Sequence, residues 1–321
     1  MPRSRQPIDL RLLNKVSRYY YEENKSEGEI SVKLHLSRSK VSRLLKQAKE
    51  VGIIQITIVS PSGVYPNLEK KLEEMYALEQ AYVVDVSDPK SQDAVTRALG
   101  NAAAHHLQNT LKEGDVIGVS WGTTLNCMVM ALQPQRTFNN TIVQIIGGLG
   151  SPTSKSHATD LCRRMASSLN CEAILLPVLG IMKSVEAKAV MMVDEHVQMA
   201  LNAFEKINLA YVGIGAPIPG SVLLQDGAIM SQADLEDIIS KGAMGDIALR
   251  FFDKDGKPIN SDMNERVVGI TLEQIKNINE VVAVTGGPQK VEAIRGALLG
   301  GYLDVLITDQ ATAKKLVSEK E

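Results

Sequence analysis

Residues 26–56 read SEGEISVKLHLSRSKVSRLLKQAKEVGIIQI. Apolar residues recur in this stretch at helical spacing, with a break near His35–Ser37. Such a break predicts two short helices joined by a tight turn, and Ser37 is suited to be the N-cap of the second helix. A helix-turn-helix has this arrangement, and the first residues of its second helix reach base edges in the major groove of DNA.

The second helix carries basic and hydroxyl side chains on the face that packing does not need. Arginine can bind guanine with two hydrogen bonds, while serine and lysine can contact phosphates or bases. A β-like apolar run over 53–59 follows and predicts a wing or a connecting strand. We therefore expect residues 1–60 to be a DNA-binding domain that contacts double-stranded operator DNA through Ser37, Arg38, Ser39, Lys40, Ser42 and Arg43.

Basic residues are also common on exposed helix faces that bind nothing, so the charge along the whole chain matters. Residues 1–60 contain 12 Lys+Arg and 6 Asp+Glu, whereas residues 61–321 contain 23 Lys+Arg and 31 Asp+Glu. The formal net charge of −2 thus combines a basic amino-terminal segment with an acidic remainder. This asymmetry indicates a protein that contacts phosphate at one end only.

Length and composition restrict the class of protein. A chain of 321 residues with 44% hydrophobic residues can form a sizeable core over two or three domains. It has no run of eighteen apolar residues and no apolar signal core at the amino terminus, so we expect a cytoplasmic protein without a membrane partner. The cysteines, Cys127, Cys162 and Cys171, lack CxxC spacing and the histidines are scattered, which predicts buried thiols and no metal site.

A turn-rich segment, PSGVYPN at 61–67, predicts a domain boundary. Beyond it, short apolar runs alternate with helical segments, as is typical of parallel strands buried on both faces. Residues 61–321 are therefore expected to form an α/β domain with a doubly wound, mostly parallel sheet. The expected strands are 81–86, 116–120, 141–146, 173–177, 210–214, 247–252, 281–285 and 305–308. The expected helices are 68–76, 92–111, 158–169, 186–205, 289–299 and 310–317.

In such folds a ligand binds beyond the carboxyl ends of the strands, where the strand order switches. GVSWGTT at 118–124 follows a strand and opens a helix, and free amides at a helix N-terminus favour an anion such as phosphate. Each glycine-rich strand end is weak evidence for a ligand site by itself, because such sequences are more often plain turns. Neither GxxxxGK[ST] nor a full GxGxxG motif occurs, which disfavours ATP and NAD, and no cofactor is expected. Similar loops are IIGGLGS at 145–151, VGIGAP at 212–217, GAMGDI at 242–247 and VTGGPQKVEAI at 284–294.

These motifs, in this order and together with YYYEEN at 19–24, resemble the SorC family of bacterial sugar-responsive transcriptional regulators, from about Leu10 to Leu316. The resemblance implies a winged helix-turn-helix followed by a domain related in fold to phosphosugar isomerases and deaminases. It also implies a phosphorylated sugar effector, with Lys290 supplying positive charge to the phosphate and Asp246 accepting sugar hydroxyls. The effector-binding residues that it implies are Ser120, Gly122, Thr123, Thr124, Gly147, Gly148, Asp246, Gly286, Gly287 and Lys290. One departure is Ser26-Glu27 and Ser31, where the family often has Thr-Gln and Ala.

The leading interpretation is a regulator of a carbohydrate-utilisation operon that binds its operator as a homo-oligomer, a dimer or a tetramer, and that has no catalytic residues. One alternative is a phosphosugar isomerase- or deaminase-like enzyme with an appended nucleic-acid-binding module, in which Asp246 and Lys290 would serve as acid and base. Another is a constitutive DNA-binding protein whose second domain only oligomerises. The segment 186–205, rich in Ala, Val and Met, is expected to belong to the core, with a subunit interface as the alternative.

Overall fold

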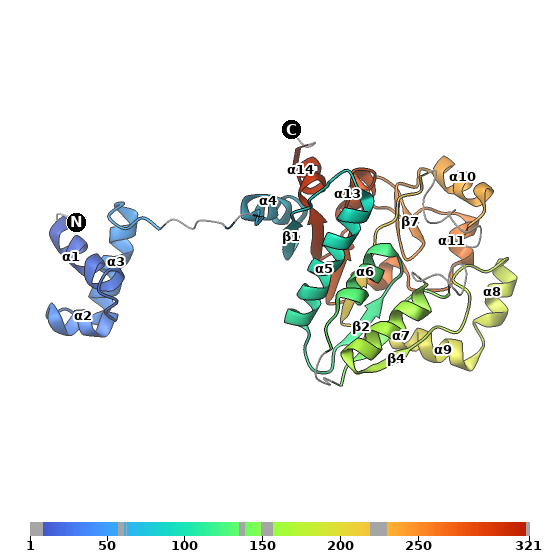
Figure 1. The fold of residues 1–321 in the computed structure, drawn as a ribbon, viewed down its shortest axis with the longest axis horizontal. Helices are drawn as coiled ribbons and strands as arrows, with labels where there is room; N and C mark the ends of the chain where they lie inside the picture. Colours follow the sequence, from blue (N-terminus) through green and yellow to red (C-terminus); the bar gives the residue numbers. More distant parts are fainter. Residues whose placement is uncertain are drawn as a thin grey trace, which may run out of the picture. The chain divides into compact units, whose positions relative to one another are not determined.

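The computed structural model describes residues 9–56, 61, 63–134, 139–148, 157–218 and 230–318. The chain forms two compact units, Met1–Ser60 and Pro61–Glu321, and each is described by itself (Figure 1).

The first unit contains helices α1 (Leu10–Tyr21), α2 (Glu27–Lys33) and α3 (Arg38–Glu50). Its small core consists of apolar residues at helical spacing, namely Val16, Ile30, Val41 and Leu45. Between α2 and α3 the chain turns at His35, which adopts a left-handed backbone conformation with φ of 54°. The predicted pair of helices with a tight turn is confirmed, whereas α1 was not anticipated from the sequence.

Both helices of the pair begin with capping residues. The Ser37 side chain accepts a hydrogen bond from the Lys40 amide at 3.2 Å, as the sequence predicted, and this satisfies one free amide of α3. At the start of α2, Ser26 and Glu29 form a reciprocal capping box. The strand expected over 53–59 is absent from the described residues 53–56, and residues 57–59 lie outside the described part of the chain.

The second unit is built on a sheet in which every neighbouring pair of strands is parallel. The predicted doubly wound α/β fold is therefore confirmed. Within the described residues the sheet has seven strands in the order β1 (Gln80–Val84), β9 (Val305–Asp309), β8 (Glu280–Val284), β5 (Leu209–Val212), β2 (Val116–Val119), β3 (Thr141–Gln144) and β4 (Glu172–Ile174).

Helices cover both faces of this sheet, so the strands are apolar on both sides. In β5, Leu209 and Tyr211 pack into one core layer while Ala210 and Val212 pack into the other. The first layer is covered by α5 (Gln92–Thr110), α6 (Thr123–Ala131) and α7 (Ala158–Leu169). The second contains residues of α4 (Pro66–Tyr76), α9 (Glu195–Asn202), α10 (Gln232–Ser240), α12 (Leu272–Lys276), α13 (Val291–Leu299) and α14 (Gln310–Ser318).

Two predicted elements were wrong in detail. The single strand expected over 247–252 is a hairpin of β6 (Gly245–Ile247) and β7 (Arg250–Phe252), because the chain reverses at two left-handed residues, Ala248 and Leu249. The helix expected over 186–205 is broken into α8 (Val185–Met191), α9 and the 3₁₀ turn Ala203–Lys206. Its break occurs because the Asp194 carboxylate accepts hydrogen bonds from the amides of His196 and Val197 and so starts a new helix. The short helices α10, α11 (Asp262–Arg266) and α12 were not predicted.

The path of the chain through the sheet places a crevice at one point. From β2 the chain runs outward to β3 and β4, and it then returns to add β5 on the other side of β2, followed by β8 and β9. The strand order therefore reverses between β2 and β5. Ligands in doubly wound sheets bind beyond the carboxyl ends of the strands at such a switch point.

Candidate functional site

A cavity of about 360 Å³ opens at this switch point. Its walls come from the loops after β2, β5 and β8, the start of α5, and β6 with its turn. The volume lies within the range typical of small-molecule sites. Six of the residues implied by the family resemblance line it together, namely Ser120, Gly122, Thr123, Thr124, Asp246 and Lys290.

Asp246 is the most unusual group in the cavity wall. Its side chain is buried, and one carboxyl oxygen, Oδ2, accepts a hydrogen bond from the Leu249 amide at 3.0 Å. The other oxygen, Oδ1, has no hydrogen-bond partner among the described residues. Burial raises the pKa of Asp246 to about 6, although the Leu249 amide and the positive charge of Lys290 act in the opposite direction. An unsatisfied buried acceptor of this kind is costly unless a ligand completes it.

The β6–β7 hairpin holds Asp246 in place. Its turn residues, Ala248 and Leu249, have φ of 51° and 61°, which is strained for residues other than glycine. At the start of β7 the Arg250 guanidinium donates hydrogen bonds to the carbonyls of Ile270 at 2.9 Å and Asn264 at 2.8 Å. These bonds tie the hairpin to the neighbouring segment, so the Asp246 carboxyl group is fixed before any ligand arrives.

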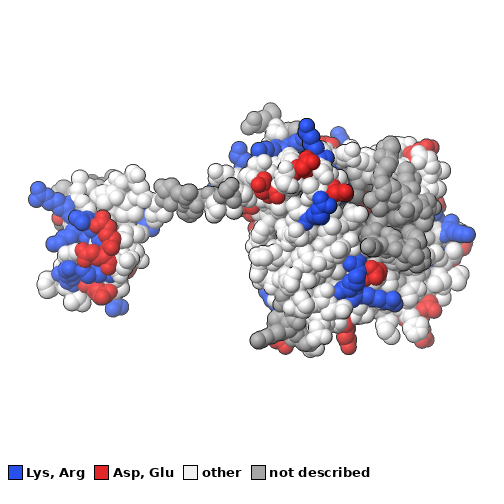
Figure 2. Space-filling model, viewed as in Figure 1, with Lys and Arg blue, Asp and Glu red and all other residues white. Residues whose placement is uncertain are grey.

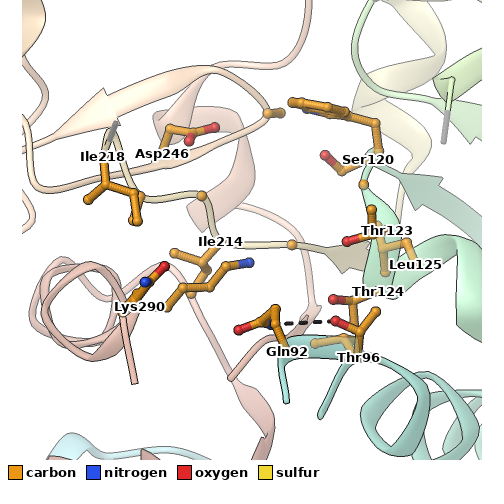
Figure 3. A pocket seen from close by; sticks show the side chains of 18 of the residues that line it. Gln92, Thr96, Ser120, Thr123, Thr124, Leu125, Ile214, Ile218, Asp246 and Lys290 are labelled. Atoms are coloured by element: carbon orange, nitrogen blue, oxygen red, sulfur yellow. Dashed lines mark hydrogen bonds between the residues drawn. The ribbon is translucent and has the colours of Figure 1, made fainter. Parts of the chain in front are cut away.

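Lys290 provides the positive charge of the cavity. It is half-buried at the N-cap position of α13, and in Figure 3 its amine reaches toward the middle of the cavity. Burial lowers the pKa of Lys290, while the nearby Asp246 acts to raise it. Figure 3 shows Asp246 and Lys290 on one side of the cavity and Ser120, Thr123 and Thr124 on the other. A ligand between them would meet charge on one side and hydroxyl groups on the other.

The loop after β2 presents the N-terminus of α6 to the cavity. The N-cap of this helix is Gly122, which has no side chain. Among the described residues, no side chain of the N-cap accepts a hydrogen bond from the amides of the first turn. The residues that follow, Thr123 and Thr124, line the cavity with Ser120 and Trp121. Uncapped amides and the helix dipole both favour an anion at this position.

The contribution of α5 to the cavity was not predicted from the sequence. Gln92, Asp93 and Thr96 lie at the start of this helix and line the cavity, and the Gln92 side-chain amide donates to the Thr96 hydroxyl at 3.4 Å (Figure 3). Gln289 also lines the cavity. The sequence did indicate a helix that begins after Ser91. Because this helix is distant in sequence from the glycine-rich loops, the sequence did not show that it lies beside them.

Four implied glycines do not line the cavity. The amide of Gly147 donates to the Val268 carbonyl at 3.0 Å, and that of Gly148 to the Val178 carbonyl at 2.8 Å, so both amides bind neighbouring chain segments. A β-carbon on Gly147 would lie 2.6 Å from the Val178 carbonyl oxygen, which explains why this position has no side chain. The remaining part of that motif, 149–151, lies outside the described residues.

Gly286 and Gly287 lie in the turn between β8 and α13. The Gly287 amide donates to the Asp309 carboxylate at 2.8 Å and to the Thr312 hydroxyl at 2.9 Å. Gly287 has φ of 102°, and a β-carbon there would lie 2.4 Å from Oε1 of Gln92. These glycines therefore shape the turn before Lys290 and leave room for Gln92.

The candidate DNA contacts lie together on α3 in the first unit. Ser37, Arg38, Ser39, Lys40, Ser42 and Arg43 are all exposed. The Arg38 guanidinium lies against α2, since a β-carbon on Gly28 would be 2.9 Å from its Nη2 atom. Figure 2 shows Lys and Arg side chains on the visible face of this unit, with acidic side chains among them.

The described residues contain no group of three or more His, Cys, Asp or Glu side chains placed to hold a metal ion. In the same part of the chain, no helix is long and apolar enough to cross a membrane. Cys162 is buried, and burial raises the pKa of its thiol, so it resembles a core residue rather than a reactive one.

Comparison with known proteins identifies the family. Residues 65–318 match the model of a sugar-binding domain family. The chain is 31% identical to the deoxyribonucleoside regulator of Bacillus subtilis, covering 99% of this chain and 100% of that one. It is 29% identical to the sorbitol operon regulator of Klebsiella pneumoniae, and the match covers 96% of this chain and 98% of that one. The crystal structure of the full-length sorbitol operon regulator SorC from Klebsiella pneumoniae superposes with a TM-score of 0.74 at 28% identity, covering 98% of this chain and 100% of that one. The chain therefore belongs to the SorC family of sugar-binding transcriptional regulators.

Proposed function

We propose that this protein is a DNA-binding transcriptional regulator of a carbohydrate-utilisation operon, and that a phosphorylated sugar bound in the switch-point cavity controls its affinity for the operator. The observation that carries this proposal is the buried Asp246 carboxyl group, which lines the cavity on the same side as Lys290 and opposite the hydroxyl side chains. We assign this carboxyl group to a sugar hydroxyl, which would donate a hydrogen bond to it. The relatives named as a sorbitol operon regulator and a deoxyribonucleoside regulator support the same class of function.

Phosphate recognition is assigned to the opposite wall. The uncapped start of α6, with the hydroxyls of Ser120, Thr123 and Thr124, offers hydrogen-bond donors to an anion. Lys290 extends its amine from the other side toward the middle of the cavity, and we assign its positive charge to the same phosphate. A phosphorylated sugar would use both ends of the cavity, with its phosphate at α6 and its hydroxyls at Asp246.

DNA recognition is assigned to the exposed face of α3. Arg38 and Arg43 are our candidates for base or phosphate contacts, and Ser37, Ser39, Lys40 and Ser42 complete the face. We propose that the protein binds its operator as a homo-oligomer, because half-sites related by two-fold symmetry match a two-fold protein. The sugar can change operator affinity only by as much as its affinity differs between two states of the protein.

The same cavity also has a feature that would suit an enzyme. Asp246 has a raised pKa and Lys290 a lowered one, and such pairs occur at acid–base sites. Since the relatives are named as regulators, we assign the cavity a binding role. Conversion of a phosphosugar by the purified protein, abolished in Asp246→Asn, would favour the isomerase- or deaminase-like alternative.

The test is the thermal stability of the purified protein with a panel of phosphorylated and free sugars. A ligand at about 100 times its dissociation constant adds about 2.7 kcal/mol of stability, which a melting curve resolves. We expect a selective shift with one sugar phosphate, and the same compound should change operator affinity. A free sugar that stabilises the protein as well as its phosphate would contradict the phosphate assignment. Absence of any shift would remove the sensor role and leave a constitutive DNA-binding protein.

A further inference from the structure

Gly28 is the second residue of α2 and lies between Glu27 and Glu29. The helix itself does not need a glycine here, because the φ of Gly28 is outside the left-handed region. Glycine also weakens a helix relative to alanine, since it loses more conformational freedom on folding. The presence of glycine at this position is therefore explained by a neighbouring residue and not by the helix.

That neighbour is Arg38, the first residue of α3. A β-carbon at position 28 would lie 2.9 Å from Nη2, 3.2 Å from Nε and 3.3 Å from Cζ of this arginine. These are the three nearest atoms, and their similar distances show that the guanidinium group covers the glycine instead of touching it with one atom. A contact of 2.9 Å is too short for a β-carbon, so any side chain at position 28 would displace the guanidinium group.

The charge of Arg38 is available to a ligand. Its side chain is exposed, and among the described residues it forms no ion pair or hydrogen bond. The Glu29 carboxylate, next to Gly28 in the sequence, instead accepts hydrogen bonds from the amide of Ser26 at 2.9 Å and from its hydroxyl at 2.7 Å. Arg38 is therefore held by packing on α2, while its N–H donors stay free for a ligand.

We propose that Gly28 is a positioning residue for operator recognition. Because it has no side chain, the Arg38 guanidinium group lies on α2 and presents its donors to one guanine of the operator. Two hydrogen bonds to a guanine require a defined direction of approach, since hydrogen bonds weaken steeply when they are misaligned. Packing on α2 also reduces the side-chain freedom that Arg38 loses on binding. This inference rests on the proposed DNA recognition by α3, to which it adds a residue of the preceding helix.

A glycine near a helix N-terminus also lets a phosphate approach the free amides of the first turn. Here the Arg38 guanidinium group occupies the space beside Gly28, and the Ser26 hydroxyl already accepts a hydrogen bond from the Glu29 amide at 3.3 Å. Both observations favour a contact with the arginine over a direct contact with DNA. The two roles differ in their consequences, because a lost phosphate contact weakens binding to every duplex whereas a misplaced Arg38 affects one base pair.

The test measures DNA binding by the full-length protein with fluorescence anisotropy. The probes are a duplex that the wild type selects from a random-sequence library and copies of it with one base pair changed. Arg38→Ala identifies the base pair that Arg38 reads, because binding of this variant no longer depends on it. We expect Gly28→Leu to lose discrimination at the same base pair and to bind the selected duplex about fivefold to 150-fold more weakly. Gly28→Ala should have a smaller effect at that base pair.

Val32→Leu is the matched control, since Val32 lies one turn beyond Gly28 on α2 and is 75% exposed. It adds bulk to the same helix and should keep the base preference of the wild type. Leucine and alanine both favour a helix, so amide hydrogen exchange of α2 should be equal or slower in the Gly28 variants. In the Arg38→Ala background, Gly28→Leu should cause no further loss, because no guanidinium group remains to be displaced.

Discrimination that is unchanged in Gly28→Leu would overturn the positioning role. Further loss in the Arg38→Ala background, or equal loss on all duplexes, would also overturn it and would place position 28 at the DNA itself. An Arg38→Ala variant with the base preference of the wild type would refute the inference while the DNA-binding function stood. A wild-type protein that selects no duplex would contradict the proposed function as well.

Discussion

Gly215 lies so close to Asp246 that a β-carbon in its place would be 2.0 Å from the Oδ1 atom of that carboxyl group. The two residues also exchange backbone hydrogen bonds, from the Gly215 amide at 3.0 Å and from the Asp246 amide at 3.1 Å. Oδ1 is the oxygen that lacks a partner in the described residues. The absence of a side chain at position 215 therefore makes room for the Asp246 carboxyl group, to which we assign a sugar hydroxyl.

We predict that Gly215→Ala weakens sugar binding by moving the Asp246 carboxyl group. The added methyl group cannot fit, and the strained turn at Ala248 and Leu249 limits how the hairpin can adjust. Overpacking of this kind costs about 1–3 kcal/mol of stability. A loss of the same size in sugar binding would raise the dissociation constant about fivefold to 150-fold. Isothermal titration with the sugar phosphate found in the thermal panel measures it.

Gly213→Ala is the matched control for this variant. Gly213 lines the same cavity, but a β-carbon there would only reach the Trp121 carbonyl oxygen at 3.5 Å, an ordinary contact. Equal losses of affinity in the two variants would show that steric change anywhere in the wall matters and that the Asp246 carboxyl group has no special role.

The stability of the protein should fall as pH rises through the titration of Asp246. Burial raises its pKa to about 6, whereas an aspartate in an unfolded chain titrates near ~3.9. The folded state then binds more protons between these values, so the stabilising contribution is complete below pH ~4 and is lost as pH approaches 6. A shift of about two units corresponds to at most about 3 kcal/mol.

Urea denaturation from pH 4 to pH 7 measures this dependence, and Asp246→Asn supplies the comparison because an amide cannot titrate. We expect the slope of unfolding free energy against pH to flatten in the variant. If wild type and Asp246→Asn respond to pH alike, the carboxyl group is already ionised in the folded protein and the burial argument fails.

The sequence predicted most of the second unit because its strands are short apolar runs between turn residues, as β5 and β9 illustrate. The same reasoning failed at 247–252, where an apolar run conceals a reversal at Ala248 and Leu249. Neither residue is a usual left-handed one, so only the surrounding packing imposes that turn. The helical spacing of apolar residues also predicted one continuous helix over 186–205. A capping aspartate within an apolar segment is only a weak sign that one helix ends and another begins.

Part of the cavity wall could be predicted from the sequence for a related reason. The loop after β2 and the residues Asp246 and Lys290 line one cavity, because the carboxyl ends of parallel strands share one edge of the sheet. Gly147 and Gly287 illustrate the limit: glycine-rich strand ends look alike in sequence, but here their amides bind neighbouring segments instead of facing the cavity. Gln92 and Thr96 lie on a helix distant in sequence, and only the folded chain shows that they belong to the wall.

Lys290→Ala should reduce affinity for the phosphorylated sugar more than for the free sugar. Hydrogen bonds that involve a charged group contribute about 1.5–3 kcal/mol, so the loss should be about tenfold to a hundredfold. Titration calorimetry with both compounds measures the difference. Operator binding without sugar should stay as in the wild type, because Lys290 belongs to the second unit. Equal loss for the free sugar would place Lys290 at a hydroxyl or assign it a purely structural role.

Arg38→Ala should weaken operator binding by about 1–3 kcal/mol if this arginine contacts a base, and the loss should be smaller on non-specific DNA. Arg38 is exposed at the first position of α3, the part of a recognition helix that enters the major groove. Arg18→Ala is the control, since Arg18 is an exposed cation of the same unit that pairs with Glu22 at 2.7 Å. Fluorescence anisotropy with operator and scrambled duplexes at fixed salt gives both affinities. A uniform loss on both duplexes would reassign Arg38 to a phosphate, and unchanged affinity for the operator would remove it from the DNA-binding face.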